Sequence, residues 1–303
     1  MSKRALQLDG GTFITDGGLE TTLVFHGGFE LPHFASFVLL DDPDGVEALR
    51  AYYRAYLEIA RSREVGIILD TPTWRANRDW GERLGYAPEA LADLNQRGVA
   101  LLEEFRSHEL LISGCIGPRG DGYRVESVMS AEEAQRYHAP QVETFARSSA
   151  DLVSALTLTY VDEAIGIVRA AQAADVPAVI SFTVETDARL PSGQALGRAI
   201  EQVDEETDRA AAFYMINCAH PTHLADALEP APWLERLRGL RANASKKSHA
   251  ELDGAEELDE GDPAELAASY RELRDLLPSL NVVGGCCGTD HRHVDAICAA
   301  VTR

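Results

Sequence analysis

Residues 281–291, "NVVGGCCGTDH", contain the pattern that decides the fold, because a short apolar run ends in glycines and a helical segment follows at once. The run 281–286 is rich in valine, which favours strands. Residues 291–301 carry apolar side chains at helical spacing. The segment is therefore predicted to be one strand–helix unit, with two adjacent cysteines at the point where the strand ends.

The same unit recurs along the whole chain. The eight strand candidates are 13–18, 65–71, 110–117, 151–158, 177–184, 211–218, 237–244 and 281–286. The helical segments that alternate with them are 44–62, 87–105, 130–148, 161–174, 194–206, 222–229, 263–277 and 291–301. Near-continuous apolar strands are typical of parallel strands buried on both faces, and eight such units close a barrel. We expect an α/β protein, a (β/α)8 TIM barrel, with an open doubly wound sheet as the alternative.

Length and charge narrow the class of protein further. The chain has 303 residues and no linker-like change in composition, so we expect a single domain over residues 1–303. Its 28 basic and 49 acidic residues give a net charge of −21, which repels nucleic acids and anionic membranes. No apolar leader and no run of about 18 to 20 apolar residues is present. We expect a cytoplasmic protein without nucleic-acid or membrane partners, and the sequence leaves its oligomeric state open.

The active site of a barrel lies where its strands end, and thiols follow three of the predicted strands. These are Cys115, Cys218 and the pair Cys286 and Cys287. In a reducing compartment, cysteines serve more often as metal ligands, nucleophiles or core residues than as disulfides. Glycines around the adjacent pair permit turns that bring both sulfurs to one point. Cys218 is the natural third thiol and Cys115 its competitor.

Three thiolates with an open fourth position are typical of a catalytic zinc site, since structural sites are closed by four protein ligands. Two other interpretations of the glycine-rich segment are buried small residues and a phosphate-binding loop. The phosphate loop is weakened by the absence of a following Lys, Ser or Thr in the order that such loops require.

Four motifs together resemble the homocysteine S-methyltransferase family, namely "GGCCGT" (284–289), "INC" (216–218), "DGGLETTL" (16–23) and "CIGPRGDGY" (115–123). Members of that family are zinc-dependent (β/α)8 barrels. The resemblance implies that zinc is bound by Cys218, Cys286 and Cys287. It also implies that the amino-acid substrate is held by Asp16, by the backbone of Gly17 and Gly18, and by Asn217.

The implied reaction moves a methyl group from a sulfonium or ammonium donor, such as S-methylmethionine, S-adenosylmethionine or a betaine, to homocysteine, giving methionine. Only a thiolate is a competent nucleophile, and zinc deprotonates a thiol whose free pKa is about 8.5. The expected partners are therefore a small-molecule thiol acceptor and a methyl donor. A cationic donor favours aromatic contacts, for which the loop candidates are Trp74, Trp80, Tyr123 and Tyr160.

One position departs from the family pattern. Many members carry a glutamate at the end of the fourth strand that binds the substrate's amino group, and the aligned residue here is Leu156. Glu185, after the fifth strand, is a candidate replacement. The alternatives are therefore a methyltransferase for a different thiol, or a barrel hydrolase or lyase with zinc-bound water. An all-sulfur ligand set favours the methyltransferase, because barrel hydrolases usually use His and carboxylate ligands.

Overall fold

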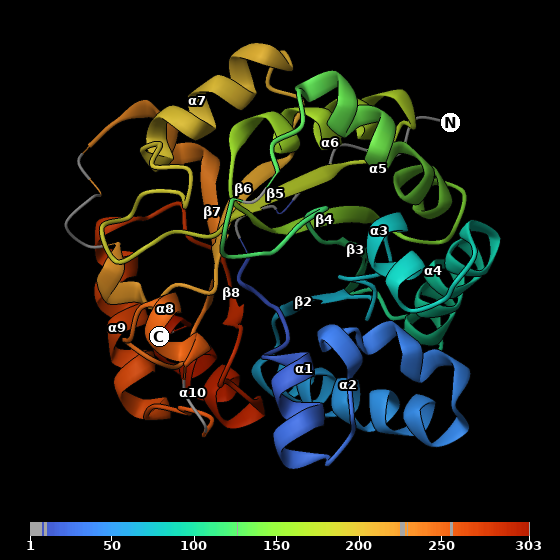
Figure 1. Cartoon of the computed structure of the whole chain (residues 1–303). Coiled ribbons are helices and arrows are strands. Elements are labelled where there is room, and N and C mark those ends of the chain that lie inside the picture. Colours follow the sequence, from blue (N-terminus) through green and yellow to red (C-terminus); the bar gives the residue numbers. More distant parts are fainter. Residues whose placement is uncertain are drawn as a thin grey trace.

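The chain forms a closed barrel of parallel strands in the order β1 to β8. The computed structural model describes residues 8, 11–125, 127–224, 228, 230–254 and 257–302. The ring closes where β1 pairs with β8, with Phe13 opposite Val282 and Ile14 opposite Val283. Figure 1 shows the strands inside and the helices around them. The predicted (β/α)8 barrel is confirmed, and the open sheet is excluded.

Every predicted strand overlaps an observed one. The strands are β1 (Phe13–Ile14), β2 (Gly66–Asp70), β3 (Leu110–Ile116), β4 (Leu152–Leu158), β5 (Ala178–Phe182), β6 (Phe213–Asn217), β7 (Leu237–Ala242) and β8 (Val282–Gly285). The prediction for β1 was too long, because residues 16–18 leave the ladder and bind the segment after β8. Gly285 N donates to Asp16 O, and Gly18 N donates to Thr289 O.

Helices follow most of the strands. They are α1 (Leu19–Thr21), α2 (Pro43–Arg63), α3 (Arg78–Arg83), α4 (Pro88–Glu103), α5 (Ala131–Ala146), α6 (Val161–Ala173), α7 (Leu196–Glu206), α8 (His249–Asp253), α9 (Pro263–Leu276) and α10 (His291–Val301). The sequence did not predict the short helices α1, α3 and α8. The predicted helix 222–229 is represented by the 3-10 turn η4 (Pro221–His223), and residues 225–227 and 229 lie outside the described residues.

The barrel interior changes from apolar to polar along its axis. A cluster of buried side chains, mostly near the starts of the strands, is formed by Leu8, Ile68, Leu152, Val179, Phe213, Met215 and Val282. Further along the strands, the Ser113 hydroxyl donates to the Ser154 hydroxyl at 2.7 Å, and the Ser181 hydroxyl donates to Asn217 Oδ1 at 2.7 Å. The polar groups therefore lie toward the carboxyl ends of the strands, where barrel enzymes bind their substrates.

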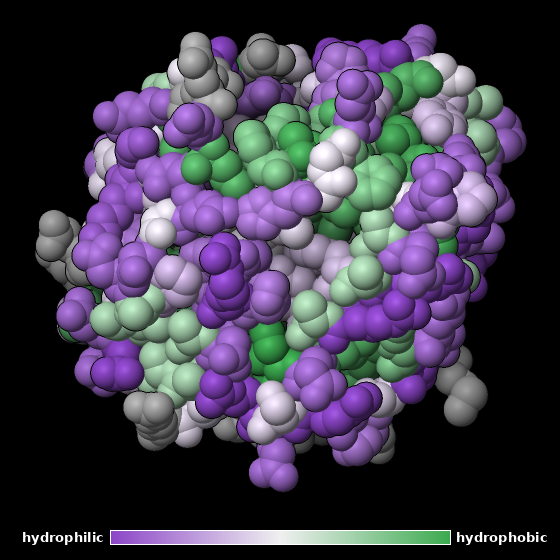
Figure 2. All heavy atoms as spheres, turned by 90° about the horizontal axis from the view of Figure 1, so that it is seen from below, coloured by the Kyte–Doolittle hydropathy of each residue, from purple (hydrophilic) through white to green (hydrophobic). Residues whose placement is uncertain are grey.

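The face of the molecule seen from below in Figure 1 is largely polar. Figure 2 shows hydrophilic residues over most of the visible face. Among the described residues, no helix combines the length and the apolarity that crossing a bilayer requires.

Candidate metal and substrate site

Three sulfur atoms meet at the carboxyl end of the barrel. Cys218 follows β6, while Cys286 and Cys287 follow β8, and β7 pairs with both of these strands. The three Sγ atoms lie within 4.8 Å of one another, and those of Cys218 and Cys287 are 3.7 Å apart. We call these residues the cysteine cluster. The sequence predicted this trio, and the structure brings it together.

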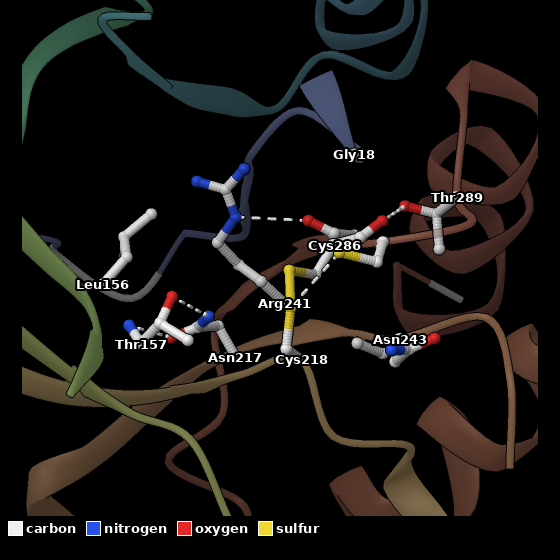
Figure 3. The surroundings of a disulfide bond; sticks show 12 residues. Gly18, Leu156, Thr157, Asn217, Cys218, Arg241, Asn243, Cys286 and Thr289 are labelled. Carbon is white, nitrogen blue, oxygen red and sulfur yellow. Dashed lines mark hydrogen bonds between the residues drawn. A yellow bond between two sulfur atoms is a disulfide. The ribbon is translucent and has the colours of Figure 1, made fainter. Parts of the chain in front are cut away.

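The cysteine cluster is partly oxidised in this structure. Cys218 and Cys286 are joined by a disulfide, which Figure 3 shows, and Cys287 is free. The sequence predicted thiols here and no disulfide. The physical reason for the difference is proximity, because thiols held at one point for a metal are also close enough to oxidise. The competitor Cys115 is buried and lies outside the cluster, and Cys298 is buried in α10.

Backbone hydrogen bonds from β7 and the residues after it hold the cluster in place. Cys218 N donates to Arg241 O at 3.0 Å, and Cys286 N donates to Ala242 O at 2.7 Å. Gly288 has a φ of +76°, so the chain turns after Cys287 in a conformation that favours glycine. The sequence predicted a role in turning for all the glycines of this segment, but the structure shows this role at Gly288 alone.

Gly284 and Gly285 serve close packing instead of a turn. Their φ angles are not in the left-handed region, yet a Cβ on Gly284 would collide with the Thr15 side chain. A Cβ on Gly285 would collide with the Thr289 side chain. Glycine is needed at both positions because β8 lies directly against its neighbours.

The donor set fits zinc. Two sulfurs on a tetrahedral zinc ion, each at about 2.3 Å, are about 3.8 Å apart, close to the separation of Cys218 and Cys287. Burial raises the pKa of the Cys287 thiol, so this group needs a cation to exist as a thiolate. The disulfide must be reduced before Cys218 and Cys286 can serve as ligands, because only thiolates bind the metal.

A tyrosine and a histidine border the cluster. The Tyr123 hydroxyl lies 3.2 Å from Cys218 Sγ and 3.8 Å from Cys287 Sγ. The ring of His249 packs on that of Tyr123 with 4.7 Å between centroids, and its Nε2 lies 2.7 Å from Cys218 O. Nothing in the sequence singled out His249. Glu185, the predicted replacement for the family's glutamate, contacts this histidine, with 3.4 Å between Glu185 Oε1 and His249 Nδ1.

Asp16 is part of a buried ion-pair network with Asp70 and Arg241, which we call the charge cluster. Arg241 Nη2 donates to Asp16 Oδ1, and Arg241 Nη1 donates to Asp70 Oδ2. The Tyr52 hydroxyl donates to Asp16 Oδ2 at 3.0 Å. Burial raises the pKa of Asp16 to about 7, with Arg241 opposing this rise and Asp70 adding to it. Both carboxylate oxygens of Asp16 therefore have protein partners.

Asn217 fixes the end of β4. Its Oδ1 accepts from Thr157 N at 2.8 Å, and its Nδ2 donates to Thr157 Oγ1 at 3.0 Å. Thr157 has a φ of +64°, which is unusual for a β-branched residue, and the register of β4 with β5 shifts between Ala155 and Leu158. Leu156 lies at this irregularity, and in Figure 3 it extends toward the side on which the Arg241 guanidinium lies. An apolar side chain thus stands at the position that we aligned, from the sequence, with the family's glutamate.

The sequence did not single out Arg241 as a site residue. The available signal for Arg241 was a charged residue inside a predicted buried strand. Among the four predicted aromatic residues, Trp74 and Trp80 enclose the Arg75 guanidinium, with its carbon 4.0 and 3.9 Å from their ring centroids. The Tyr160 hydroxyl accepts from Met129 N, and Tyr123 reaches the cysteine sulfurs.

Comparison with known proteins gives the family. The homocysteine S-methyltransferase model matches residues 13–301, and no curated protein sequence matches. The metallated homocysteine methyltransferase MmuM of Escherichia coli is 21% identical, with a TM-score of 0.73 and 99% of each chain covered. Its oxidized form is also 21% identical, with a TM-score of 0.75 and the same coverage. The structural likeness shows the fold. Because the family model spans nearly the whole chain, the chain belongs to the homocysteine S-methyltransferase family and is a methyltransferase.

Proposed function

We propose that the chain is a zinc-dependent S-methyltransferase that transfers a methyl group from a sulfonium or ammonium donor to homocysteine or a related thiol. The observation that supports this most is the convergence of Cys218, Cys286 and Cys287 at the carboxyl end of a barrel of this family. A zinc ion held by these three residues would supply deprotonation and orientation of the acceptor thiol. The alternative of a hydrolase or lyase is set aside by the family and by the all-sulfur donor set.

The reaction needs no covalent bond to the protein. The acceptor sulfur's electron pair forms the new carbon–sulfur bond while the methyl group's bond to the donor sulfur or nitrogen breaks, leaving a neutral sulfide or amine. The task of the protein is therefore to hold both molecules in line and to exclude water. Asn217 contributes by fixing Thr157 and the end of β4 beside the cysteine cluster.

The close contact between the segments after β1 and β8 supports a substrate site beside the cysteine cluster. A Cβ on Gly18 would meet Cys286 O at 2.6 Å, so only glycine lets the segment that follows β1 lie against residues 286–289, which we call the metal loop. We keep the backbone of Gly17 and Gly18 as a candidate substrate contact. Direct contact between Asp16 and the substrate's ammonium group stays a prediction. The ammonium group would have to compete with Arg241 and Tyr52, which already bind the two carboxylate oxygens. We also keep the expectation of a cytoplasmic enzyme that acts on small molecules.

The test is methyl transfer by reduced, zinc-loaded protein. L-Homocysteine is incubated with S-methylmethionine, S-adenosylmethionine or betaine carrying a deuterated methyl group, and methionine is read by mass spectrometry. Labelled methionine is expected with at least one donor, and it should disappear after chelation and return with added zinc. The matched variants are Cys287→Ser, which should lose the activity, and Cys298→Ser, which should keep it. Equal activity in both variants would contradict the proposal.

A further inference from the structure

A tyrosine on the segment between β3 and α5 lies against the cysteine cluster. The Tyr123 hydroxyl is 3.2 Å from Cys218 Sγ and 3.8 Å from Cys287 Sγ. A tyrosine hydroxyl carries one proton and donates to one acceptor at a time, so the shorter distance assigns this proton to Cys218. Among the described residues, no hydrogen bond joins Tyr123 to Cys286. The sulfurs of the cluster therefore differ in their contact with this hydroxyl.

Tyr123 is held in place by its own segment. Its backbone N donates to Asp121 Oδ1 at 2.8 Å. The preceding residue, Gly122, packs so closely on the Trp74 ring and on Thr157 that a Cβ added to it would lie 3.0 Å from each. These contacts involve no cysteine. The position of the Tyr123 hydroxyl therefore follows from the packing of the segment and not from the state of the sulfurs.

His249, the first residue of α8, links the tyrosine ring to the backbone of Cys218. The rings of His249 and Tyr123 are 4.7 Å apart between centroids, and His249 Nε2 donates to Cys218 O at 2.7 Å. Cys218 N in turn donates to Arg241 O at 3.0 Å. Rings and backbone atoms make these contacts, so they do not depend on the disulfide to Cys286. We therefore expect the Tyr123 hydroxyl to stay beside Cys218 Sγ once the cluster is reduced.

A hydrogen bond to one sulfur matters because several sulfurs meet at the metal. A zinc site with three thiolates has a net negative charge, and an acceptor thiolate adds a fourth. Each thiolate is a possible nucleophile toward the donor's methyl group. A hydrogen bond stabilises the negative charge on a sulfur and so makes it a weaker nucleophile. A site that methylates the acceptor alone needs its own thiolates to be less reactive than the acceptor's.

Methylation of a cluster cysteine would disable the site. If the Cys218 sulfur attacked the methyl group, a carbon–sulfur bond would form while the methyl group's bond to the donor broke. The products would be S-methylcysteine and a neutral sulfide or amine. Because a metal-binding cysteine has to be a thiolate, the zinc ion would lose one of its ligands.

We propose that Tyr123 is a positioning residue whose hydroxyl donates a hydrogen bond to the Cys218 thiolate and so keeps this sulfur from competing with the acceptor for the methyl group. This inference rests on the proposed function and adds how the site spares one of its own ligands. At 3.8 Å, Cys287 is a weaker partner of the same hydroxyl, and Cys286 serves as an internal comparison.

The first test measures the reactivity of each cysteine and needs no methyl donor. Reduced, zinc-loaded wild type and Tyr123→Phe are treated with iodoacetamide to a low extent, and tandem mass spectrometry gives the initial rate at each cysteine. Phenylalanine keeps the ring beside His249 and removes only the hydroxyl, so alkylation of Cys218 should be about tenfold faster. Cys286 should keep its rate.

Two outcomes of this test would overturn the proposal. An unchanged rate at Cys218 would mean that the hydroxyl does not restrain this thiolate. An equal rise at Cys218 and Cys286 would mean that the substitution opens the site to the reagent and acts through access instead of through a hydrogen bond.

The matched control is Tyr86→Phe, which removes the same group elsewhere. The Tyr86 hydroxyl donates to Asp41 Oδ2 at 3.1 Å, and its ring packs on that of Phe37. Every cysteine of this variant should be alkylated at the wild-type rate. A rise at Cys218 as large as in Tyr123→Phe would show a general loosening of the protein and would contradict the assignment.

The second test detects the hydrogen bond through the metal. Cobalt(II) is bound to reduced wild type, Tyr123→Phe and Tyr86→Phe, and the sulfur-to-cobalt charge-transfer band is recorded. A hydrogen bond lowers the energy of the sulfur lone pair, so the band should lie at longer wavelength in Tyr123→Phe than in the other two proteins. The d–d bands should keep their intensity. A fixed charge-transfer band, or d–d bands that report a lost ligand, would refute this role of Tyr123.

Failure of this inference can be told from failure of the proposed function. If wild type methylates homocysteine while Tyr123→Phe shows neither faster alkylation of Cys218 nor a shifted band, methyl transfer stands and the role of Tyr123 falls. If wild type methylates no thiol, yet both changes appear, the proposed reaction falls and the hydrogen bond to Cys218 stands.

Discussion

The cysteine cluster and the charge cluster lie at strand ends of the same barrel, yet they differ in how many of their side-chain atoms remain free to bind a ligand. The sulfurs of the first contact one another and the Tyr123 hydroxyl. In the charge cluster, by contrast, both oxygens of Asp16 are taken by Arg241 and Tyr52. Strand ends bring reactive side chains together in both places. The thiols stay available once they are reduced, whereas Asp16 has a protein partner on each oxygen and the charge cluster keeps only Asp70 Oδ1 without one.

The difference follows from the partners that each side chain finds inside a protein. A buried carboxylate needs compensation and obtains it from Arg241 on another strand. A thiol is nearly apolar and can be buried without a partner until a metal binds. Position at a strand end therefore predicts which residues meet, and their chemistry decides which of them remain free.

The largest effect on stability is expected at the centre of the charge cluster. Arg241→Met leaves the buried Asp16 and Asp70 without their cation, which should cost about 3–5 kcal/mol of unfolding free energy in urea at pH 7. The exposed Arg83→Met should change it by less than about 0.5 kcal/mol. A cost below about 1 kcal/mol for Arg241→Met would mean that these carboxylates do not depend on Arg241.

Much of the fold could be predicted from the sequence because buried parallel strands are continuous apolar runs. The eight runs are distinct, and loops with capping residues separate them. The boundaries of β1 were missed because residues 16–18 bind the metal loop, a long-range contact that no local pattern encodes. The helices α1 and α3 were missed because they are only 3 and 6 residues long, too short for periodicity to appear.

The candidate site could be predicted only in part. Cys286 and Cys287 were evident because adjacent thiols between glycines are rare. The pairing of Asp16 with Arg241 was not, since it joins residues from opposite ends of the chain. A single sequence shows which residues are present at strand ends but not which partners they find.

The next effect concerns pH. The pKa of Asp16 is about 7 in the folded protein and about 4 in the unfolded chain, so the folded state keeps a proton between these values. The stability from this proton is fully present below about pH 4 and is lost as the pH rises through about 7. Relative to Asp16→Asn, the free energy of unfolding of wild type should therefore fall by about 2–4 kcal/mol between pH 4 and pH 8. Denaturation curves of both proteins across this range check the prediction, and parallel pH profiles would refute it.

The smallest effect is expected at Glu185, the predicted replacement for the family's glutamate. The Glu185 side chain is 38% exposed and already faces His249, so Glu185→Gln should change kcat/KM for homocysteine by less than about threefold. Leu156→Glu should raise kcat/KM for homocysteine if the glutamate at this position is the only missing contact. A tenfold or greater loss of kcat/KM in Glu185→Gln would show that Glu185 binds the ammonium group. A tenfold gain of kcat/KM in Leu156→Glu would show that the chain lacks a contact that the family's glutamate makes.

The central claim is that the cysteine cluster is a metal site, and the zinc content of reduced protein tests it most directly. Wild type, Cys287→Ser and Cys298→Ser are reduced, loaded with zinc, freed of excess metal and measured by elemental mass spectrometry. The account predicts about one zinc per chain in wild type and in Cys298→Ser, and close to none in Cys287→Ser. Full zinc occupancy in Cys287→Ser, or none in reduced wild type, would contradict it.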